Sequence, residues 1–127
     1  MKPKDKNPEF IFPSTIPLPE DVIITPERWH YILVGEGTSG GHSRYSTYYP
    51  SQIDGKQKQT YFDDWDEFEI AFVIASVVLF ARGDDVDNQG PLAEIRYGNW
   101  RKKRIRVVLS RLKEADPWLI FTAYPTN

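Results

Sequence analysis

The longest apolar run in the chain lies between Ile70 and Ala81 and predicts its clearest helix. Asp66 precedes the run and Glu69 follows Asp66 by three residues, which is the spacing of a capping box. The run is apolar on nearly every side, so we expect a central, buried helix over 68–82. Its β-branched residues make a strand the competing interpretation, but its length and caps favour a helix.

A shorter helix is predicted over 26–33. Thr25 can cap it, and Pro26 suits the first helical position, where a backbone N–H has no helical partner. Gly35 is expected to end it. Residues 34–58 are rich in Gly, Ser and Tyr and are typical of a loop, and such length in a compact domain indicates function or disorder.

The last third of the chain alternates apolar and polar residues in a way that predicts three strands, over 93–97, 104–112 and 118–124. A polar loop at 84–90 precedes them. Turns at 98–100 and 114–117 join them, and such short connections produce an antiparallel meander.

Five prolines fall within the first 19 residues and prevent a long helix there. We therefore expect residues 1–25 to form an extended proline-rich arm whose apolar side chains lie across the domain. Helices followed by strands indicate an α+β fold, with the arm and helices packed on a C-terminal antiparallel sheet. Residues 26–127 are expected to form one domain.

Composition narrows the function. The chain of 127 residues has no cysteine, which excludes disulfides, a cysteine-ligated zinc site and a cysteine nucleophile. No secretory signal is recognisable, and the apolar run is shorter than the roughly 20 residues needed to span a bilayer.

The charge is nearly balanced overall but unevenly placed. The net charge is −2, yet residues 63–87 contain eight acids and one Arg, and residues 95–113 contain eight basic residues and no acid. A balanced total can hide a basic face that holds phosphates. A solvated hairpin with a charged tip is the alternative.

The only two histidines, His30 and His42, suit acid–base chemistry near neutral pH. On RNA, one would activate the 2′-OH and the other would protonate the leaving 5′ oxygen, giving a 2′,3′-cyclic phosphate without a metal. The alternatives are packing or surface residues, or metal ligands. Two histidines without spaced carboxylates fall short of a typical ligand set.

The glycine-rich segment 35–42 lacks the Gly-Lys-Ser/Thr ending of a P-loop and follows a helix rather than a strand. Its glycines, Gly41 among them, would let the backbone approach an RNA phosphate. A flexible linker is the alternative.

Two main segments of the sequence resemble the bacterial EndoU nucleases, and residues 60–62, 65 and 105–108 between them also fit. Residues 27–42 are similar to the His-Ile-Leu-x-Gly element, acidic residue and Gly-Gly-His of that family, with Tyr31 as one extra residue after the first histidine. The closing Thr-Ala-Tyr-Pro at 122–125 is similar to its Thr-x-Tyr-Pro motif. The resemblance runs from about residue 26 to residue 127 and does not cover the arm.

The resemblance implies an endoribonuclease that cuts RNA by transesterification, often at uridine. It gives His30 the role of general acid and His42 that of general base. A third catalytic residue, usually Lys, is expected between the histidines and the long helix. Lys58 is the better candidate by its distance along the sequence from Trp65, and Lys56 is the second candidate. A cation there would stabilise the charge that develops on the phosphorane.

Thr122 and Tyr124 lie two residues apart in the last predicted strand, so their side chains share a face. The resemblance implies that this face holds the base or ribose, because a Tyr ring can stack and a Thr hydroxyl can hydrogen-bond. Ordinary strand residues are the alternative.

The resemblance also implies the biological setting. Such domains are the C-terminal toxic part of larger secreted or delivered proteins, act in the cytoplasm of a target cell, and are neutralised by a cognate immunity protein. RNA is the expected substrate, with tRNA one candidate, and neither a cofactor nor a membrane partner is expected. A non-catalytic RNA-binding or protein-interaction module and a metal-dependent phosphodiesterase are the alternatives.

Overall fold

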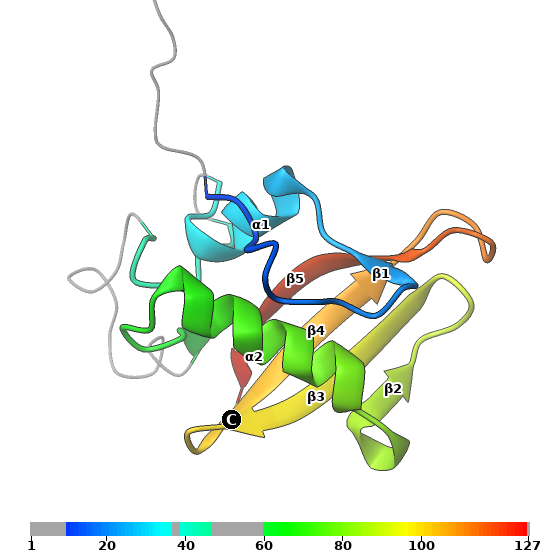
Figure 1. Cartoon of the computed structure of the whole chain (residues 1–127). Coiled ribbons are helices and arrows are strands. Elements are labelled where there is room, and N and C mark those ends of the chain that lie inside the picture. Colours follow the sequence, from blue (N-terminus) through cyan, green and yellow to red (C-terminus); the bar gives the residue numbers. More distant parts are fainter. Residues whose placement is uncertain (1–9, 37–38, 47–59, 127) are drawn as a thin grey trace, which may run out of the picture.

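The computed structural model describes residues 10–36, 39–46 and 60–126, and it has a mixed α+β fold (Figure 1). The helices are α1 (Pro26–Leu33), α2 (Glu67–Phe80) and the short 3-10 helix η2 (Gly83–Asp85). The strands are β1 (Val22–Ile23), β2 (Val86–Asn88), β3 (Ala93–Trp100), β4 (Lys103–Ser110) and β5 (Trp118–Thr126). No helix in the described ranges is long and apolar enough to cross a membrane.

The five strands form one sheet in the order β1-β5-β4-β3-β2. The predicted antiparallel meander of the last three strands is confirmed. The sheet is nevertheless mixed, because β1 joins β5 in parallel, and the purely antiparallel prediction was wrong there. β1 lies within the predicted arm and β2 within the predicted polar loop. Both are only two or three residues long and depend on a longer neighbour for pairing, so no local pattern marks them.

The hairpin between β3 and β4 is tighter than predicted. The strand continues through the expected turn at 98–100, and the chain reverses at Arg101 and Lys102. Both residues have positive φ, 48° and 67°, as a two-residue type I′ turn requires. Trp100 remains in the strand because its backbone pairs with Lys103, and its indole N–H donates to Glu69 on α2.

Both predicted helices are present, and their predicted caps are confirmed. The hydroxyl of Thr25 accepts from the backbone N–H of Arg28 at 3.2 Å. The carboxylate of Asp66 accepts from the N–H of Glu69 at 2.9 Å. α2 begins one residue before the predicted start at 68. It ends at Phe80, two residues before the predicted end at 82, because the backbone at Ala81 is already extended.

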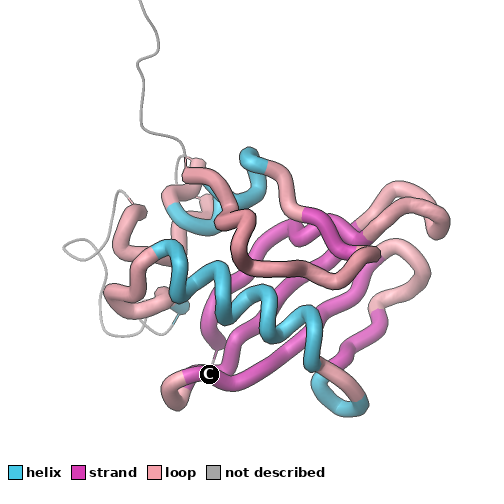
Figure 2. Tube along the Cα trace, in the orientation of Figure 1, coloured by secondary structure: helices cyan, strands magenta, loops and turns pink. Residues whose placement is uncertain are grey.

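α2 is not central, as the all-round apolar pattern predicted, but lies across one face of the sheet (Figure 2). One side of it, including Ile70, Ile74 and Val77, is buried against the sheet and α1. The other side exposes Phe68 and Phe80, at 58% and 62% of their surface, together with Phe72 and Leu79. Among the described residues, only one side of α2 is therefore packed against other elements of the fold.

The core joins both helices, the sheet and part of the arm in one cluster. Trp29 of α1 and Phe62 are fully buried in it, and burying a side chain of this size contributes on the order of 2–3 kcal/mol. The arm packs against the cluster as expected, through Phe10, Phe12, Ile16 and Leu18. α1 is thereby fixed beside β5 (Figure 1).

The strand register assigns the residues of the sheet to two faces. Arg96, Gly98 and Trp100 face α2, since Arg96 donates to the carbonyl of Val78 at 2.7 Å and a Cβ on Gly98 would meet Val77 at 2.8 Å. Alternate residues of each strand point to the opposite face. Cross-strand pairing extends that face through Arg106 of β4 and its neighbours. We call this surface the far face; it includes Tyr97, Arg104, Arg106, Val108, Thr122 and Tyr124.

Candidate active site at His42 and Tyr124

The chain folds back after α1 and closes the C-terminal end of that helix. The N–H groups of Gly41 and His42 donate to the carbonyls of Tyr31 and Ile32, each at 2.8 Å. The hydroxyl of Ser43 donates to the next carbonyl, that of Leu33, at 2.6 Å. Carbonyls at a helix C-terminus have no helical partner. Residues 40–43, which we call the return segment, satisfy three of them in succession. It fixes the backbone of His42 to the last turn of α1.

Glycine is required at Gly40 and Gly41 for this return. Both have positive φ, 71° and 72°, and both approach the helix end closely. A Cβ on Gly41 would lie 2.5 Å from the carbonyl oxygen of Val34, and one on Gly40 would lie 2.7 Å from that of Tyr31. The N–H of Gly41 is engaged within the protein, so its structural role is to position His42. The predicted contact of Gly41 with substrate stays a prediction.

The ring of His42 is held from a second side by the segment before α2. Its Nδ1 lies 3.0 Å from the carbonyl oxygen of Thr60, and its own carbonyl accepts from the N–H of Phe62 at 2.7 Å. A carbonyl only accepts, so the proton of the neutral imidazole is on Nδ1. Nε2 then carries the lone pair and can take a proton from a substrate.

Burial lowers the pKa of His42 below its ordinary value of about 6.5. The cause is desolvation, which disfavours the charged imidazolium; the hydrogen bond to Thr60 opposes it and has the smaller effect. The ring is therefore neutral at pH 7. A neutral histidine whose lone pair is on Nε2 has the protonation state of a general base.

The ring of Tyr124 lies against the ring of His42. The centroids are 4.8 Å apart and the planes are inclined by 23°, which is a stacked arrangement. Tyr61 meets the same imidazole edge-on at 6.1 Å. Tyr124 is on the far face, so His42 reaches that face at the β5 side of the sheet. The histidine motif and the closing Thr-x-Tyr-Pro motif thus meet at one place.

Thr122 lies on the same face, two residues before Tyr124, as predicted. Its side-chain oxygen is buried and has no hydrogen-bond partner in the described part of the chain. Arg106 pairs with Tyr124 across β4 and β5, and its guanidinium carbon is 5.8 Å from the centroid of the Tyr124 ring. An imidazole and a guanidinium therefore lie next to the Tyr124 ring, and a buried hydroxyl shares its face of the sheet.

His30 lies on the helix that holds the backbone of His42, but its side chain makes no described contact with His42 or Tyr124. It is half-buried on α1, two residues before Ile32, whose carbonyl holds the backbone of His42. Within residues 10–36, 39–46 and 60–126, no hydrogen bond, ion pair or ring contact connects its side chain to His42 or Tyr124. Its role as the second catalytic histidine stays a prediction. Lys58 and Lys56 lie outside the described residues.

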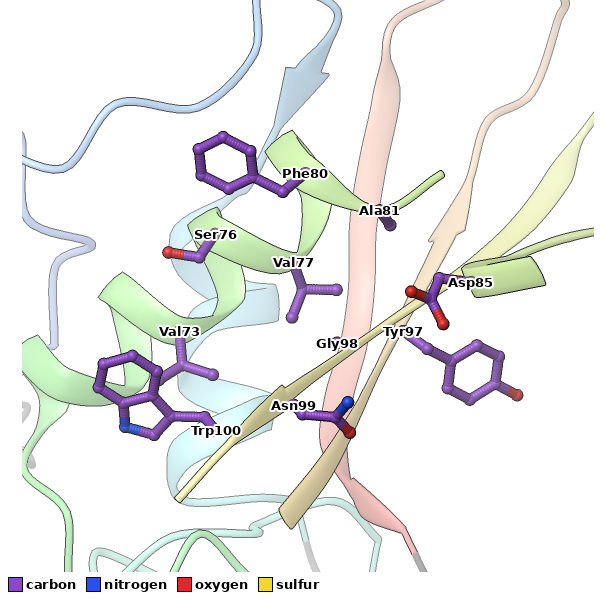
Figure 3. Close-up of a pocket in the computed structure, with 10 residues that line it drawn as sticks. All are labelled: Val73, Ser76, Val77, Phe80, Ala81, Asp85, Tyr97, Gly98, Asn99 and Trp100. Atoms are coloured by element: carbon purple, nitrogen blue, oxygen red, sulfur yellow. The ribbon is translucent and has the colours of Figure 1, made fainter. Parts of the chain in front are cut away.

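Two further features of the described residues concern ligands. No group of three or more His, Asp or Glu side chains among them is placed to hold a metal ion. A cavity of about 300 Å³ lies between α2 and the end of β3 (Figure 3), and His42 is not among the residues that line it. Its walls are Val73, Ser76, Val77, Phe80, Ala81, Asp85, Tyr97, Gly98, Asn99 and Trp100.

The sequence predicted His42, Thr122 and Tyr124 as site residues. Arg106 and Thr60 lie in segments that fit the resemblance, but neither was predicted as a site residue. Arg106 belongs to the alternating stretch Arg104-Ile105-Arg106-Val107, which marks it as a far-face residue once the sheet is oriented. No pattern in the sequence identifies Thr60, because it acts through its backbone carbonyl.

Comparisons with protein-family models, with curated proteins and with solved structures gave no significant match.

Proposed function

We propose that this chain is a metal-independent endoribonuclease that cuts RNA by attack of the 2′-OH on the neighbouring phosphate. The observation that carries the proposal is the state of His42. Its Nδ1 faces a carbonyl, its pKa is lowered by burial, and its ring is stacked on Tyr124 at 4.8 Å. A neutral base beside an aromatic platform is what the 2′-OH step requires on a stacked nucleotide.

In the proposed reaction, Nε2 of His42 takes the proton of the 2′-OH. The 2′ oxygen forms a bond to phosphorus, the bond from phosphorus to the 5′ oxygen breaks, and that oxygen receives a proton from an acid. The products are a 2′,3′-cyclic phosphate and a free 5′-OH. We assign the acid to His30 and the supporting cation to Lys58, both on the resemblance to EndoU nucleases.

The same resemblance supports an EndoU-like fold and the wider role. We propose a toxin domain, delivered as the C-terminal part of a larger protein into the cytoplasm of a target cell and neutralised by an immunity protein. Uridine-containing RNA is the proposed substrate, and tRNA is one candidate.

Purified chain incubated with a mixed-sequence RNA in EDTA tests the activity. We expect cleavage products that end in a 2′,3′-cyclic phosphate. A matched substrate with one 2′-deoxyribose should not be cut at that position, because the nucleophile is missing. His42→Ala should lower kcat/KM by roughly 10²–10⁴-fold, the usual contribution of a positioned base. Full activity of the His30→Ala, His42→Ala double variant would overturn the mechanism.

A non-catalytic RNA-binding module is the second candidate. The row of aromatic and basic side chains Tyr124, Arg106 and Tyr97 across the far face supports it, since such rows suit single strands. Binding of RNA without cleavage over a pH series, unchanged by His42→Ala, would favour this candidate over the enzyme.

A further inference from the structure

Arg106 stands at the centre of the far face. Strand pairing places it opposite Tyr124 on one side and opposite Tyr97 on the other. The row Tyr124, Arg106, Tyr97 thus crosses three strands, and His42 lies at its β5 end, stacked on Tyr124. The side chain of Arg106 therefore lies next to the same Tyr124 ring on which His42, the candidate base, is stacked.

The charge of Arg106 is not balanced by any carboxylate in the described part of the chain. The other arginine of β4 on this face, Arg104, donates to Asp85 at 2.8 Å. On the opposite face, Arg96 donates to Glu94 at 2.7 Å. Arg106 is half-buried, and its Nε is shielded from water without a hydrogen-bond partner among the described residues. A cation that is partly removed from water and has no counter-ion among the described residues is unfavourable there, and a bound anion would relieve that cost.

Thr122 supplies a second unsatisfied polar group on the same face. Its side-chain oxygen is buried and has no partner within the described ranges. Thr122 pairs with Val108, two residues along β4 from Arg106, so the two side chains are diagonal neighbours on one face. Buried polar groups in folded proteins are nearly always paired, and these two unpaired groups lie on one face of the sheet.

We propose that Arg106, assisted by the hydroxyl of Thr122, forms a phosphate-binding site for the phosphodiester of a single-stranded nucleic acid whose nucleotide stacks on Tyr124. The guanidinium offers a planar fork that matches two phosphate oxygens. The guanidinium carbon lies 5.8 Å from the centroid of the Tyr124 ring, so the fork is next to the ring that His42 also contacts.

The catalytic consequence rests on the proposed nuclease function. If the chain cuts RNA, the guanidinium of Arg106 stabilises the charge that develops on the phosphorane. The phosphate site itself does not depend on cleavage, so the two proposals can fail separately.

Binding of an uncleavable probe tests the site directly. The probe is a fluorescein-labelled single-stranded 2′-deoxy oligonucleotide, titrated with the full chain and followed by anisotropy. We expect Arg106→Gln to weaken binding about 10-fold or more, because it removes charge-assisted hydrogen bonds. Arg106→Lys should recover part of the affinity, since it keeps the charge but loses the fork. The matched control Arg104→Gln should change the affinity less than about 2-fold, because Arg104 is already ion-paired.

Salt and thermal shift separate a binding role from a structural one. The slope of log affinity against log salt should become shallower by about 0.7 in Arg106→Gln, as expected for one lost phosphate contact. Inorganic phosphate should raise the melting temperature of the wild type and leave that of Arg106→Gln unchanged. Equal affinity of Arg106→Gln and wild type, or equal losses in Arg104→Gln and Arg106→Gln, would overturn the site. Tight binding through Arg106 without any RNA cleavage would keep the site and reject the nuclease.

Discussion

The imidazole of His42 is stacked on the ring of Tyr124, with 4.8 Å between centroids and 23° between planes. The two residues come from opposite ends of the domain. His42 is carried by the return segment after α1, and Tyr124 is near the end of β5. The contact excludes water from one side of the imidazole, which is consistent with the lowered pKa of His42.

Removing the ring of Tyr124 should therefore raise the pKa of His42. Tyr124→Ala admits water to the face of the imidazole, so the pKa should return toward its ordinary value of about 6.5. Tyr124→Phe keeps the stack and should leave the pKa as it is in the wild type. An NMR titration of the His42 Hε1 resonance measures both. Identical titration curves for the Ala and Phe variants would show that the stack does not shield His42.

The pH dependence of cleavage should follow the same pKa. A base must be neutral to act, so kcat/KM should fall on the acid side as His42 becomes protonated. Because burial lowers its pKa, this fall should be centred below about pH 6.5. In Tyr124→Ala the acid limb should move to higher pH. Initial rates over pH 4–8 give the profile, and an acid limb unaffected by Tyr124→Ala would argue against His42 as the base.

The sequence predicts those parts of the fold and of the site that depend on residues close together along the chain. The caps at Thr25 and Asp66, and the three long strands, follow from residue type and spacing alone. The shared face of Thr122 and Tyr124 follows from the two-residue repeat of a strand.

The rest depends on tertiary geometry that no window of sequence contains. β3 extends beyond its predicted end at residue 97 and continues to Trp100, whose backbone pairs with Lys103 and whose indole is held by Glu69 of α2. The exposed side of α2 could not be distinguished from its buried side, since both are apolar. Arg106 gains its position from pairing with β5 and from the absence of a described carboxylate partner, and neither appears in its own strand pattern.

Folding stability should also report the burial of His42. The pKa is lowered in the folded state, so between that value and about 6.5 the unfolded chain binds more protons. The contribution of His42 to stability is therefore complete above about pH 6.5 and is lost as the pH falls through the folded pKa. His42→Gln cannot titrate, so its free energy of unfolding should decrease less than that of the wild type between pH 7.5 and 5. Urea denaturation at the two pH values measures the difference, and parallel losses in both proteins would contradict it.

Replacing Gly41 in the return segment should destabilise the fold more than replacing a glycine that has open space around it. Gly41→Ala must place a Cβ 2.5 Å from the carbonyl oxygen of Val34 at a φ of 72°. Gly83→Ala is the matched control, because Gly83 has a similar φ of 61° but open space around the position of a Cβ. We expect Gly83→Ala to cost about 1 kcal/mol, the strain of the left-handed backbone alone, and Gly41→Ala to cost about 3 kcal/mol. Gly41→Ala should also raise the pKa of His42 and lower cleavage, since it displaces the backbone that holds the ring. Chemical denaturation together with the NMR titration of His42 tests both effects, and equal costs for the two variants would mean that the return segment is not packed against α1 as tightly as the structure has it.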